Sequence, residues 1–331
     1  MKFLIAGLGS IGRRHLRNLK ALGETDLMFY RTHQATLPDT DLIGYQTYTD
    51  LDQALEQKPD GVIVANPTAL HLEVAIAAAK ADAALLIEKP ISDSLIGIRD
   101  LQNILKKTGK PTLVGYHLRY HPVLQQIKAL IESDRLGKAL KAHAHWGEYL
   151  PNWHPWEDYR HSYAARADLG GGVLNTLSHP LDYMRWLMGE VRSVSADLAN
   201  LSDLELDVED NAEVMLHLQS GSLATVHLDY YQQPPCHTLE IIFEKGMVKW
   251  ESASGCATIV DVSQNKTEVI CPPENFDRND MFLAEMEAFV RLCKGEQIEH
   301  CTLSDGKRVQ KIVEVARQSA SQKGCAVQLP S

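Results

Sequence analysis

The chain has 331 residues, of which 44% are hydrophobic and 23% are charged, the proportions of an ordinary globular protein. This length exceeds what a single hydrophobic core usually supports, so we expect two domains. The 33 basic and 43 acidic side chains leave a net charge of −10, and there is no basic block, which argues against nucleic-acid binding. No apolar run is long enough to span a membrane.

The cysteines all lie in the C-terminal third of the chain and form no Cys-x-x-Cys pair. They are Cys236, Cys256, Cys271, Cys293, Cys301 and Cys325. We therefore expect free thiols, with no disulfide framework and no zinc site. The apolar run at the N-terminus is too short for a signal peptide, so the expected location is cytoplasmic.

A glycine motif follows the first apolar run, Phe3–Ala6, and precedes a helical pattern of apolar residues. Its spacing is G-x-G-x-x-G, and the order of strand, turn and helix is the context in which this motif binds a dinucleotide. The first glycine permits the tight turn, the second lets a pyrophosphate approach the backbone, and the third lets the helix pack closely. Backbone N–H groups at the helix start then face the phosphates. The alternative is a structural turn that binds no ligand. The expected contacts are Gly7, Gly9, Ser10, Ile11 and Gly12.

Strands and helices alternate up to residue 120. Further strands are expected at 26–30, 45–48, 61–65, 84–88 and 111–115, and further helices at 51–56, 69–80 and 94–107. Near-continuous apolar strands between helices indicate a doubly wound parallel sheet covered on both faces. Ligands of such sheets bind beyond the C-terminal ends of the strands. Polar residues follow three of these ends, in Asn66-Pro67-Thr68, Glu88-Lys89-Pro90 and Tyr116-His117.

The pattern changes after residue 120. A helix is expected at 122–133, a strand at 140–146, an irregular aromatic stretch at 153–160, and one helix from the glycines at 170–172 to about 188. Strands are then expected at 192–199, 211–218, 222–231, 238–244, 246–251 and 256–262, and helices at 281–293 and 304–319. Tight-turn signals between alternating runs indicate a mostly antiparallel sheet. The predicted fold class is α/β, with a Rossmann domain over 1–120 and an α+β domain with an open sheet over 121–331.

Five stretches resemble the Gfo/Idh/MocA oxidoreductases, a family named for glucose–fructose oxidoreductase and inositol dehydrogenase. They are the glycine loop at 7–12, NPTALH at 66–71, EKP at 88–90, GYHLRYHP at 115–122 and GGGVLNTLSHPLD at 170–182. The resemblance implies an NAD(P)-dependent enzyme that acts on sugars, cyclitols or sugar nucleotides. It also implies a cis peptide bond between Lys89 and Pro90. Beyond the glycine loop, the expected cofactor contacts are Arg31, Thr32, Asn66, Pro67, Thr68, His71, Glu88 and Lys89.

Three residues are expected to act in catalysis: Lys89, His179 and Asn175. The Lys89 ammonium can donate to the substrate oxygen and to the nicotinamide ribose, unless it is a surface lysine neutralised by Glu88. His179 can accept the hydroxyl proton, unless it is a core histidine. Asn175 stands where the family usually has aspartate; an amide can bind substrate but cannot take a proton. Asp182 is on the same helical face as His179 and could orient it.

The aromatic stretch at 153–160 either lines a sugar pocket or is a structural loop pinned by buried tryptophans. Trp faces can stack on a pyranose, and Arg160 can bind a carboxylate or phosphate. Arg119 and His121 either reach the cleft or cap the next helix, and capping is favoured for His121. The expected substrate contacts are Arg119, Trp153, His154, Tyr159, Arg160 and Asp182.

The sequence after the second strand favours NADP(H). NAD enzymes usually place an acidic side chain on the ribose about 20 residues past the glycine loop. Here no Asp or Glu occurs between Asp26 and Asp39. Arg31, with Thr32 and Arg13, can instead receive a 2′-phosphate, so we expect NADP(H) to bind at least as well as NAD(H).

Three functions remain open at this point. The leading one is an NAD(P)-dependent oxidoreductase for a sugar-type substrate. The second is a transient oxidation followed by elimination, as in NAD-dependent glycosidases, with no net redox change. The third is a cofactor-binding regulatory protein without activity.

Histidines alternate along one face of the predicted antiparallel sheet, at 143, 145, 217 and 227, while Ala, Val and Leu occupy the other face. The histidine face is either solvated, a metal site or a subunit interface. Histidines scattered on a flat sheet form no closed coordination shell, so we expect no metal. A solvated face would carry more Lys and Glu. We therefore expect a homodimer or homotetramer formed through this sheet.

Overall fold

The computed structural model describes residues 1–32 and 42–329, which fold into two units. The first unit comprises Met1–His117, Asp168–Gly170 and Arg278–Gln310, and the second comprises the remaining segments. The predicted division at residue 120 is close to the first break. The assignment of all later residues to the second domain is wrong, because Arg278–Gln310 returns to the first unit.

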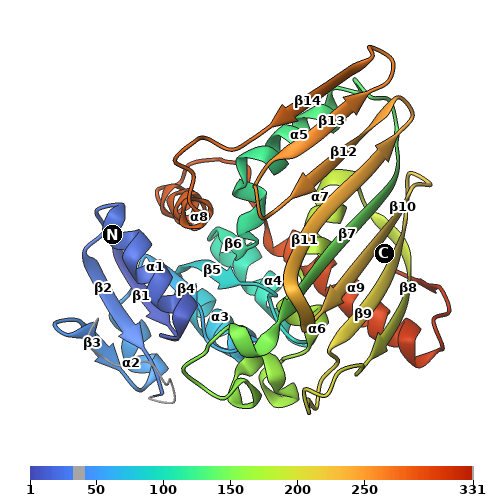
Figure 1. The fold of residues 1–331 in the computed structure, drawn as a ribbon. Coiled ribbons are helices and arrows are strands. Elements are labelled where there is room, and N and C mark those ends of the chain that lie inside the picture. The colour runs from blue at the N-terminus through green and yellow to red at the C-terminus, as the bar shows by residue number, and fades with distance from the viewer. Residues whose placement is uncertain (33–41, 330–331) are drawn as a thin grey trace. The chain divides into compact units, whose positions relative to one another are not determined.

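The first unit is built on a parallel sheet. Its strands are β1 (Lys2–Ala6), β2 (Asp26–Tyr30), β3 (Gln46–Tyr48), β4 (Gly61–Val64), β5 (Ala84–Glu88) and β6 (Thr112–Gly115). Within the described residues they form a six-stranded sheet in the order β3-β2-β1-β4-β5-β6 (Figure 1). This is the order of a Rossmann fold, in which the chain direction across the sheet reverses between β1 and β4 and ligands bind at that point. The predicted doubly wound fold is confirmed.

Helices bury both faces of this sheet. They are α1 (Ser10–Ala21), α2 (Leu51–Leu55), α3 (His71–Lys80), α4 (Ile98–Thr108) and α8 (Arg278–Cys293). Every residue of β4 and β5 is buried, as expected for strands covered on both sides. The Phe289 ring of α8 packs against Phe3 of β1 with ring centroids 6.0 Å apart, which explains why α8 belongs to this unit.

The second unit is built on a larger sheet. Its strands are β7 (Ala139–Tyr149), β8 (Val191–Ala199), β9 (Asn211–Leu218), β10 (Leu223–Asp229), β11 (Tyr231–Phe243), β12 (Gly246–Glu251), β13 (Ala257–Asp261), β14 (Lys266–Ile270) and β15 (Val327–Gln328). In the described part of the chain the order is β14-β13-β12-β11-β7-β10-β9-β8-β15. All neighbours are antiparallel except β7 and β10, which run parallel. The mostly antiparallel sheet is confirmed, although β14 and β15 were not predicted.

Helices lie on one face of this second sheet (Figure 1). They are α5 (Pro122–Glu132), α6 (Val173–Thr176), α7 (His179–Met188) and the C-terminal part of α9 (Leu303–Ser321). The side chains predicted to face these helices are buried, among them Val214, Leu216, Val226 and Leu228. The predicted single helix from 170 to 188 is wrong, because the chain leaves the helical path at residues 177–178 and restarts at His179.

A disulfide joins Cys256 and Cys271, so the prediction of free thiols is wrong for these two residues. The register of the β13–β14 hairpin pairs Ala257 with Ile270, and the two cysteines are the next residues outward on each strand. Their Cα atoms are therefore only 4.1 Å apart. The other cysteines of the described chain are free thiols. No described helix combines the length and apolar character needed to cross a membrane.

Candidate active site

The glycine loop of the first unit fits a dinucleotide. Gly7 has a φ of +95°, and a Cβ there would lie 2.5 Å from the backbone nitrogen of Asn66. A Cβ on Gly12 would overlap the carbonyl oxygen of Gly7. Gly9 is different, because nothing lies within 4 Å of the position its Cβ would take. This open position is at the N-cap of α1, whose glycine has no side chain to cap the first N–H groups, so the loop can accept a pyrophosphate.

The two arginines predicted to read a 2′-phosphate are largely buried. Arg13 Nε donates to the carbonyl oxygen of Leu8 at 3.1 Å and thus holds the glycine loop. The backbone N–H of Arg31 donates to the carbonyl oxygen of Tyr48, while Thr32 is exposed. The argument about the missing acidic residue also rests on the segment up to Asp39. From position 33 onward, this segment lies outside the described residues.

The loop after β4 is tied to the bend after β5. The ring nitrogens of His71 lie 2.8 Å from the carbonyl oxygen of Asn66 and 2.9 Å from that of Pro90. Burial lowers the pKa of His71, although both carbonyl contacts oppose this shift. The Asn66 side chain donates to the carbonyl oxygen of Leu70, and Thr68 is buried. His71 therefore holds the loop after β4 to the bend after β5. Contact between its ring nitrogens and a cofactor stays a prediction.

Lys89 follows directly on the C-terminal end of β5, and the Lys89–Pro90 bond is cis, as the resemblance implied. Glu88 faces His15 of α1, with Oε1 2.7 Å from Nε2, and its Oε2 accepts from the Lys89 backbone N–H at 3.2 Å. Burial opposes ionisation of Glu88, but the His15 hydrogen bond and the charges of His15 and Lys89 outweigh it and lower the pKa of the carboxyl. The Glu88 carboxylate thus anchors α1 to β5, and its predicted cofactor contact remains untested.

Two further ionisable side chains of the first unit take their environment from α8: Glu285, which had no sequence signal, and His117, which the sequence placed after the end of a strand. Burial raises the pKa of Glu285 well above its usual range, and the Glu88 charge adds to this effect. Neither Glu285 carboxyl oxygen has a hydrogen-bond partner among the described residues. His117 stacks on Phe282 with ring centroids 3.9 Å apart, and burial, together with the charge of Arg278, lowers its pKa well below the usual value.

In the second unit the glycines before α6 shape the turn that carries Asn175. Gly172 has a φ of +96°, and its N–H donates to the carbonyl oxygen of Ala164. A Cβ at this position would overlap the Glu209 carboxylate, which accepts from the backbone of Leu174. A larger residue at 172 would therefore displace the start of α6.

His179 and Asn175, predicted on one helix, lie on two. His179 is the first residue of α7 and is buried, with its ring stacked on that of Trp146 at a centroid distance of 5.6 Å. Asn175 is buried in α6 and donates from Nδ2 to the carbonyl oxygen of Gly171 at 3.3 Å. The structure therefore places an amide and an imidazole in consecutive short helices, each held by its own neighbours.

Arg119 and Asp182 are bound to each other. Nε and Nη2 of Arg119 donate to the two carboxylate oxygens of Asp182 at 2.8 Å and 2.6 Å. This pair is largely shielded from solvent and links residues before α5 to α7. A role in substrate binding stays a prediction for both. His121 caps α5 as predicted, because its Nδ1 accepts from the backbone of Val123.

The aromatic stretch makes several contacts within the second unit. Trp153 packs edge-on against Tyr230 at 5.6 Å, and the Tyr159 hydroxyl donates to the carbonyl oxygen of Leu204 at 3.0 Å. The exposed Arg160 binds the carboxylates of Asp158 and Glu205. His154 lies against Trp156, with ring centroids 4.9 Å apart. These contacts hold parts of the stretch in place, but the tryptophans are not the buried pins that the structural-loop alternative expected, because Trp153 is half-buried and Trp156 is 60% exposed. Sugar binding by the stretch is untested.

Family models match both parts of the chain. The model described as "Oxidoreductase family, NAD-binding Rossmann fold" matches residues 1–116, and the "GFO/IDH/MocA C-terminal domain" matches residues 124–249. An uncharacterized oxidoreductase YrbE from Bacillus subtilis is 27% identical and covers 95% of this chain and 93% of its own length. Myo-inositol 2-dehydrogenase from Thermotoga maritima is 26% identical and covers 98% of this chain and 97% of its own length.

Solved structures share the fold. Levoglucosan dehydrogenase in complex with NADH and levoglucosan aligns with a TM-score of 0.88 and 18% identity over the full length of both chains. GenD2 from gentamicin A biosynthesis, in complex with NAD, aligns with a TM-score of 0.83 and 23% identity over 100% of this chain and 97% of its own. Because the two family models together match well over half of its residues, the chain belongs to the Gfo/Idh/MocA family of oxidoreductases.

Proposed function

We propose that the protein is an NAD(P)-dependent dehydrogenase or reductase that transfers a hydride between the cofactor and a CH–OH or C=O group of a sugar, cyclitol or sugar nucleotide. One observation carries this proposal. The open glycine loop after β1 and Lys89 after β5 occur at the same edge of one parallel sheet, where its strands end. Ligands of doubly wound sheets bind at that edge.

The chain's own groups have distinct tasks in this proposal. The bound nicotinamide supplies a hydride acceptor in oxidation and a hydride donor in reduction. The Gly9 region and the N-terminal N–H groups of α1 hold the pyrophosphate. Lys89 donates a hydrogen bond to the reacting oxygen and stabilises negative charge on it. His179 takes the hydroxyl proton in oxidation and returns it in reduction.

Asn175 has a binding task, because an amide cannot exchange a proton with the substrate. It donates and accepts hydrogen bonds with substrate hydroxyls. We extend the same proposal to the predicted sugar contacts of the aromatic stretch: Trp153, His154, Tyr159 and Arg160. The names of relatives support a polyhydroxylated ring as substrate, since they include myo-inositol 2-dehydrogenase and glucose-6-phosphate 3-dehydrogenase.

Two finer points belong to the proposal. The first is that NADP(H) binds at least as well as NAD(H), through the Arg31 guanidinium and the Thr32 hydroxyl. The basis is that no Asp or Glu occurs between Asp26 and Asp39. The second is a homodimer or homotetramer formed through the open sheet of the second unit.

The activity is tested with the full-length enzyme, NAD⁺ and NADP⁺, and a substrate panel of inositols, hexoses, hexose phosphates and levoglucosan. We expect substrate-dependent appearance of reduced cofactor with at least one ring polyol or sugar. Cofactor binding without any reduction would contradict a net dehydrogenase. Adding aryl glycosides to the panel distinguishes the elimination reaction from a dehydrogenase. Release of a phenol without net reduction of the cofactor would identify elimination.

A further inference from the structure

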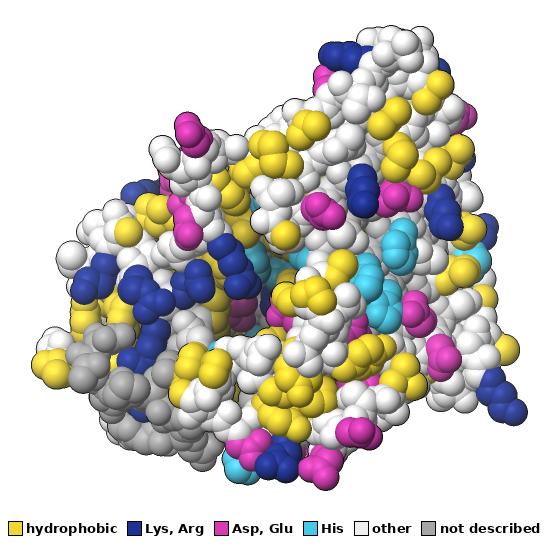
Figure 2. Space-filling model, in the orientation of Figure 1, with side chains coloured by type: hydrophobic (Ala, Val, Ile, Leu, Met, Phe, Trp, Pro, Cys, Tyr) yellow, Lys and Arg dark blue, Asp and Glu magenta, His cyan; other side chains and the backbone are white. Residues whose placement is uncertain are grey.

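Histidine side chains gather on the face of the second sheet that faces away from the helices (Figure 2). His145 of β7 and His227 of β10 are directly paired in the parallel ladder. Asp229 follows two residues after His227, at the end of β10. The expectation that these histidines are scattered is wrong. We propose that His145, His227 and Asp229 bind one divalent transition-metal ion, with Zn²⁺ as the best-suited ion.

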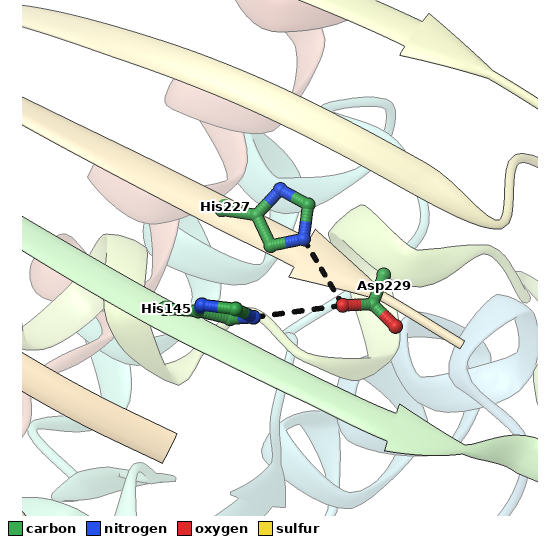
Figure 3. A group of neighbouring side chains, drawn as sticks. All are labelled: His145, His227 and Asp229. Carbon is green, nitrogen blue, oxygen red and sulfur yellow. Dashed lines mark hydrogen bonds and ion pairs between the residues drawn. The ribbon is translucent and has the colours of Figure 1, made fainter. Parts of the chain in front are cut away.

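The donor atoms already have the separations that a metal needs. One donor from each residue lies within 4.8 Å of the other two. Asp229 Oδ2 is 3.0 Å from His227 Nε2 and 3.7 Å from His145 Nε2 (Figure 3). A tetrahedral zinc with bonds of 2.0–2.1 Å separates its ligand atoms by ~3.3 Å. Small side-chain movements are therefore enough to close the shell around an ion.

A glycine lets two of the oxygen donors lie close against strand β7. Gly147 of β7 is the ladder partner of Asp229. A Cβ at this position would overlap Asp229 Oδ2 and would lie 2.7 Å from Gln232 Oε1. The Gln232 oxygen is also 2.8 Å from His145 Nε2, so it is placed to become a fourth ligand or to hold a metal-bound water. This close approach of Asp229 and Gln232 to the β7 backbone is an observation independent of the histidine pairing.

Neighbouring groups orient the ligands as they do in metal sites. Asp229 is fully buried, and its Oδ1 accepts from the backbone N–H groups of Tyr231 and Gln232 at 3.0 Å and 2.7 Å. Its other oxygen, Oδ2, is the one near both histidines. The Glu213 carboxylate contacts Nδ1 of His227, so that Nε2 points to Asp229. A carboxylate on the second ring nitrogen is the usual partner of a metal-bound histidine.

The donor set selects the class of ion. Two imidazole nitrogens with one carboxylate suit Zn²⁺ and its first-row neighbours, whereas Ca²⁺ and Mg²⁺ prefer all-oxygen sites. The ion would link β7 to β10, the parallel pair in an otherwise antiparallel sheet within the described residues. The competing explanation is that a proton takes the place of the metal ion. The same contacts would then belong to a protonated His227 held between the carboxylates of Glu213 and Asp229.

The test measures metal content of the full-length protein, freed of any histidine tag and stripped with EDTA. After dialysis against micromolar ZnCl₂, we expect one zinc per chain by elemental analysis and a one-site isotherm by calorimetry. The double variant His145→Ala, His227→Asn should lose this zinc. The matched control is His217→Ala, because His217 lies on β9 outside the cluster; it should bind zinc like the parent protein.

Two milder variants keep all three ligands. Gly147→Ala forces a methyl group against Asp229 Oδ2 and should weaken zinc binding at least 10-fold, and Glu213→Gln should weaken it by about 10- to 100-fold. Circular dichroism and NADH titration show whether each variant is folded. Zinc at well under one equivalent in the parent protein would overturn the proposal and favour the proton. The proposal would also be overturned if the parent protein, the folded double variant and Gly147→Ala all bound the same amount of zinc per chain.

Discussion

Lys89 and His179 are the two side chains to which the proposed reaction assigns charge stabilisation and proton transfer. Lys89→Ala and His179→Ala should each lower kcat by about 10² or more, because each removes an interaction made to the reacting oxygen. NADH affinity, measured by fluorescence titration, should change little in either variant. Asn175→Ala should act mainly on KM. An unchanged kcat in His179→Ala would assign the base to another residue, such as His154 or Tyr159.

Arg31 is the residue on which cofactor preference depends. Its backbone N–H is bonded to Tyr48, so removing the guanidinium leaves the strand pairing in place. Loss of a charge-assisted hydrogen bond to a 2′-phosphate costs about 1.5–3 kcal/mol. Arg31→Ala should therefore weaken NADP(H) at least 10-fold and leave NAD(H) nearly unchanged. Much tighter binding of NAD(H) than NADP(H) by the parent protein would refute the proposed preference.

At the scale of elements, the turn between β1 and α1 contains one glycine expected to matter for cofactor binding, Gly9, and another expected to matter for stability, Gly12. Gly9→Ala places a methyl group in open space, so its melting temperature should match the parent while its NADH affinity falls sharply. Gly12→Ala forces a methyl group against the Gly7 carbonyl and should destabilise the protein by about 1–3 kcal/mol. Thermal melts without cofactor and NADH titrations on both variants check this. A Gly9→Ala protein with unchanged NADH affinity would contradict the assigned pyrophosphate site.

The packing of α8 buries Glu285 without hydrogen-bond partners in the described chain. The pKa of Glu285 is raised in the folded state. At pH values above the ordinary pKa of a carboxyl group, the folded state therefore keeps a proton that the unfolded state releases. Stability is therefore lost as pH rises above that value. Glu285→Gln removes this loss, and its melting temperature should exceed the parent's by more at about pH 8 than at about pH 5. Equal differences at the two pH values would mean that Glu285 is not held protonated.

Local patterns were enough to predict the strands of the first sheet, the glycine turn and the alternation in β9 and β10. Each of these depends on residues close in sequence. The break between α6 and α7 was missed because both helices are apolar enough to be buried, and Pro180 is compatible with the first turn of a helix. The β13–β14 hairpin was missed because β14, KTEVI, has little apolar character, and the Cys256–Cys271 pairing was missed with it.

For the molecule as a whole, the sequence shows which face of a helix is apolar but not which sheet that face covers. Helix α8 follows the eight strands β7–β14 of the second unit, yet Phe289 completes the core beside Phe3. Likewise, histidine alternation predicted an uncovered face but not the convergence of His145, His227 and Asp229. That convergence depends on the parallel pairing of β7 with β10, which no local pattern encodes.

The uncovered face of the second sheet also predicts the oligomeric state. It carries Met215 and Leu223, which are 40% and 39% exposed, among histidines and charged side chains such as Lys141, Glu213 and Glu240. Stacking this face on that of a second copy would bury these apolar groups and satisfy a two-fold axis. We expect a dimer or tetramer at micromolar concentration in sedimentation velocity, run with EDTA so that metal content is constant. Met215→Lys should shift the distribution towards monomer, whereas Leu201→Lys, at an exposed position outside the sheet, should not. A monomeric parent protein at neutral pH would refute the interface.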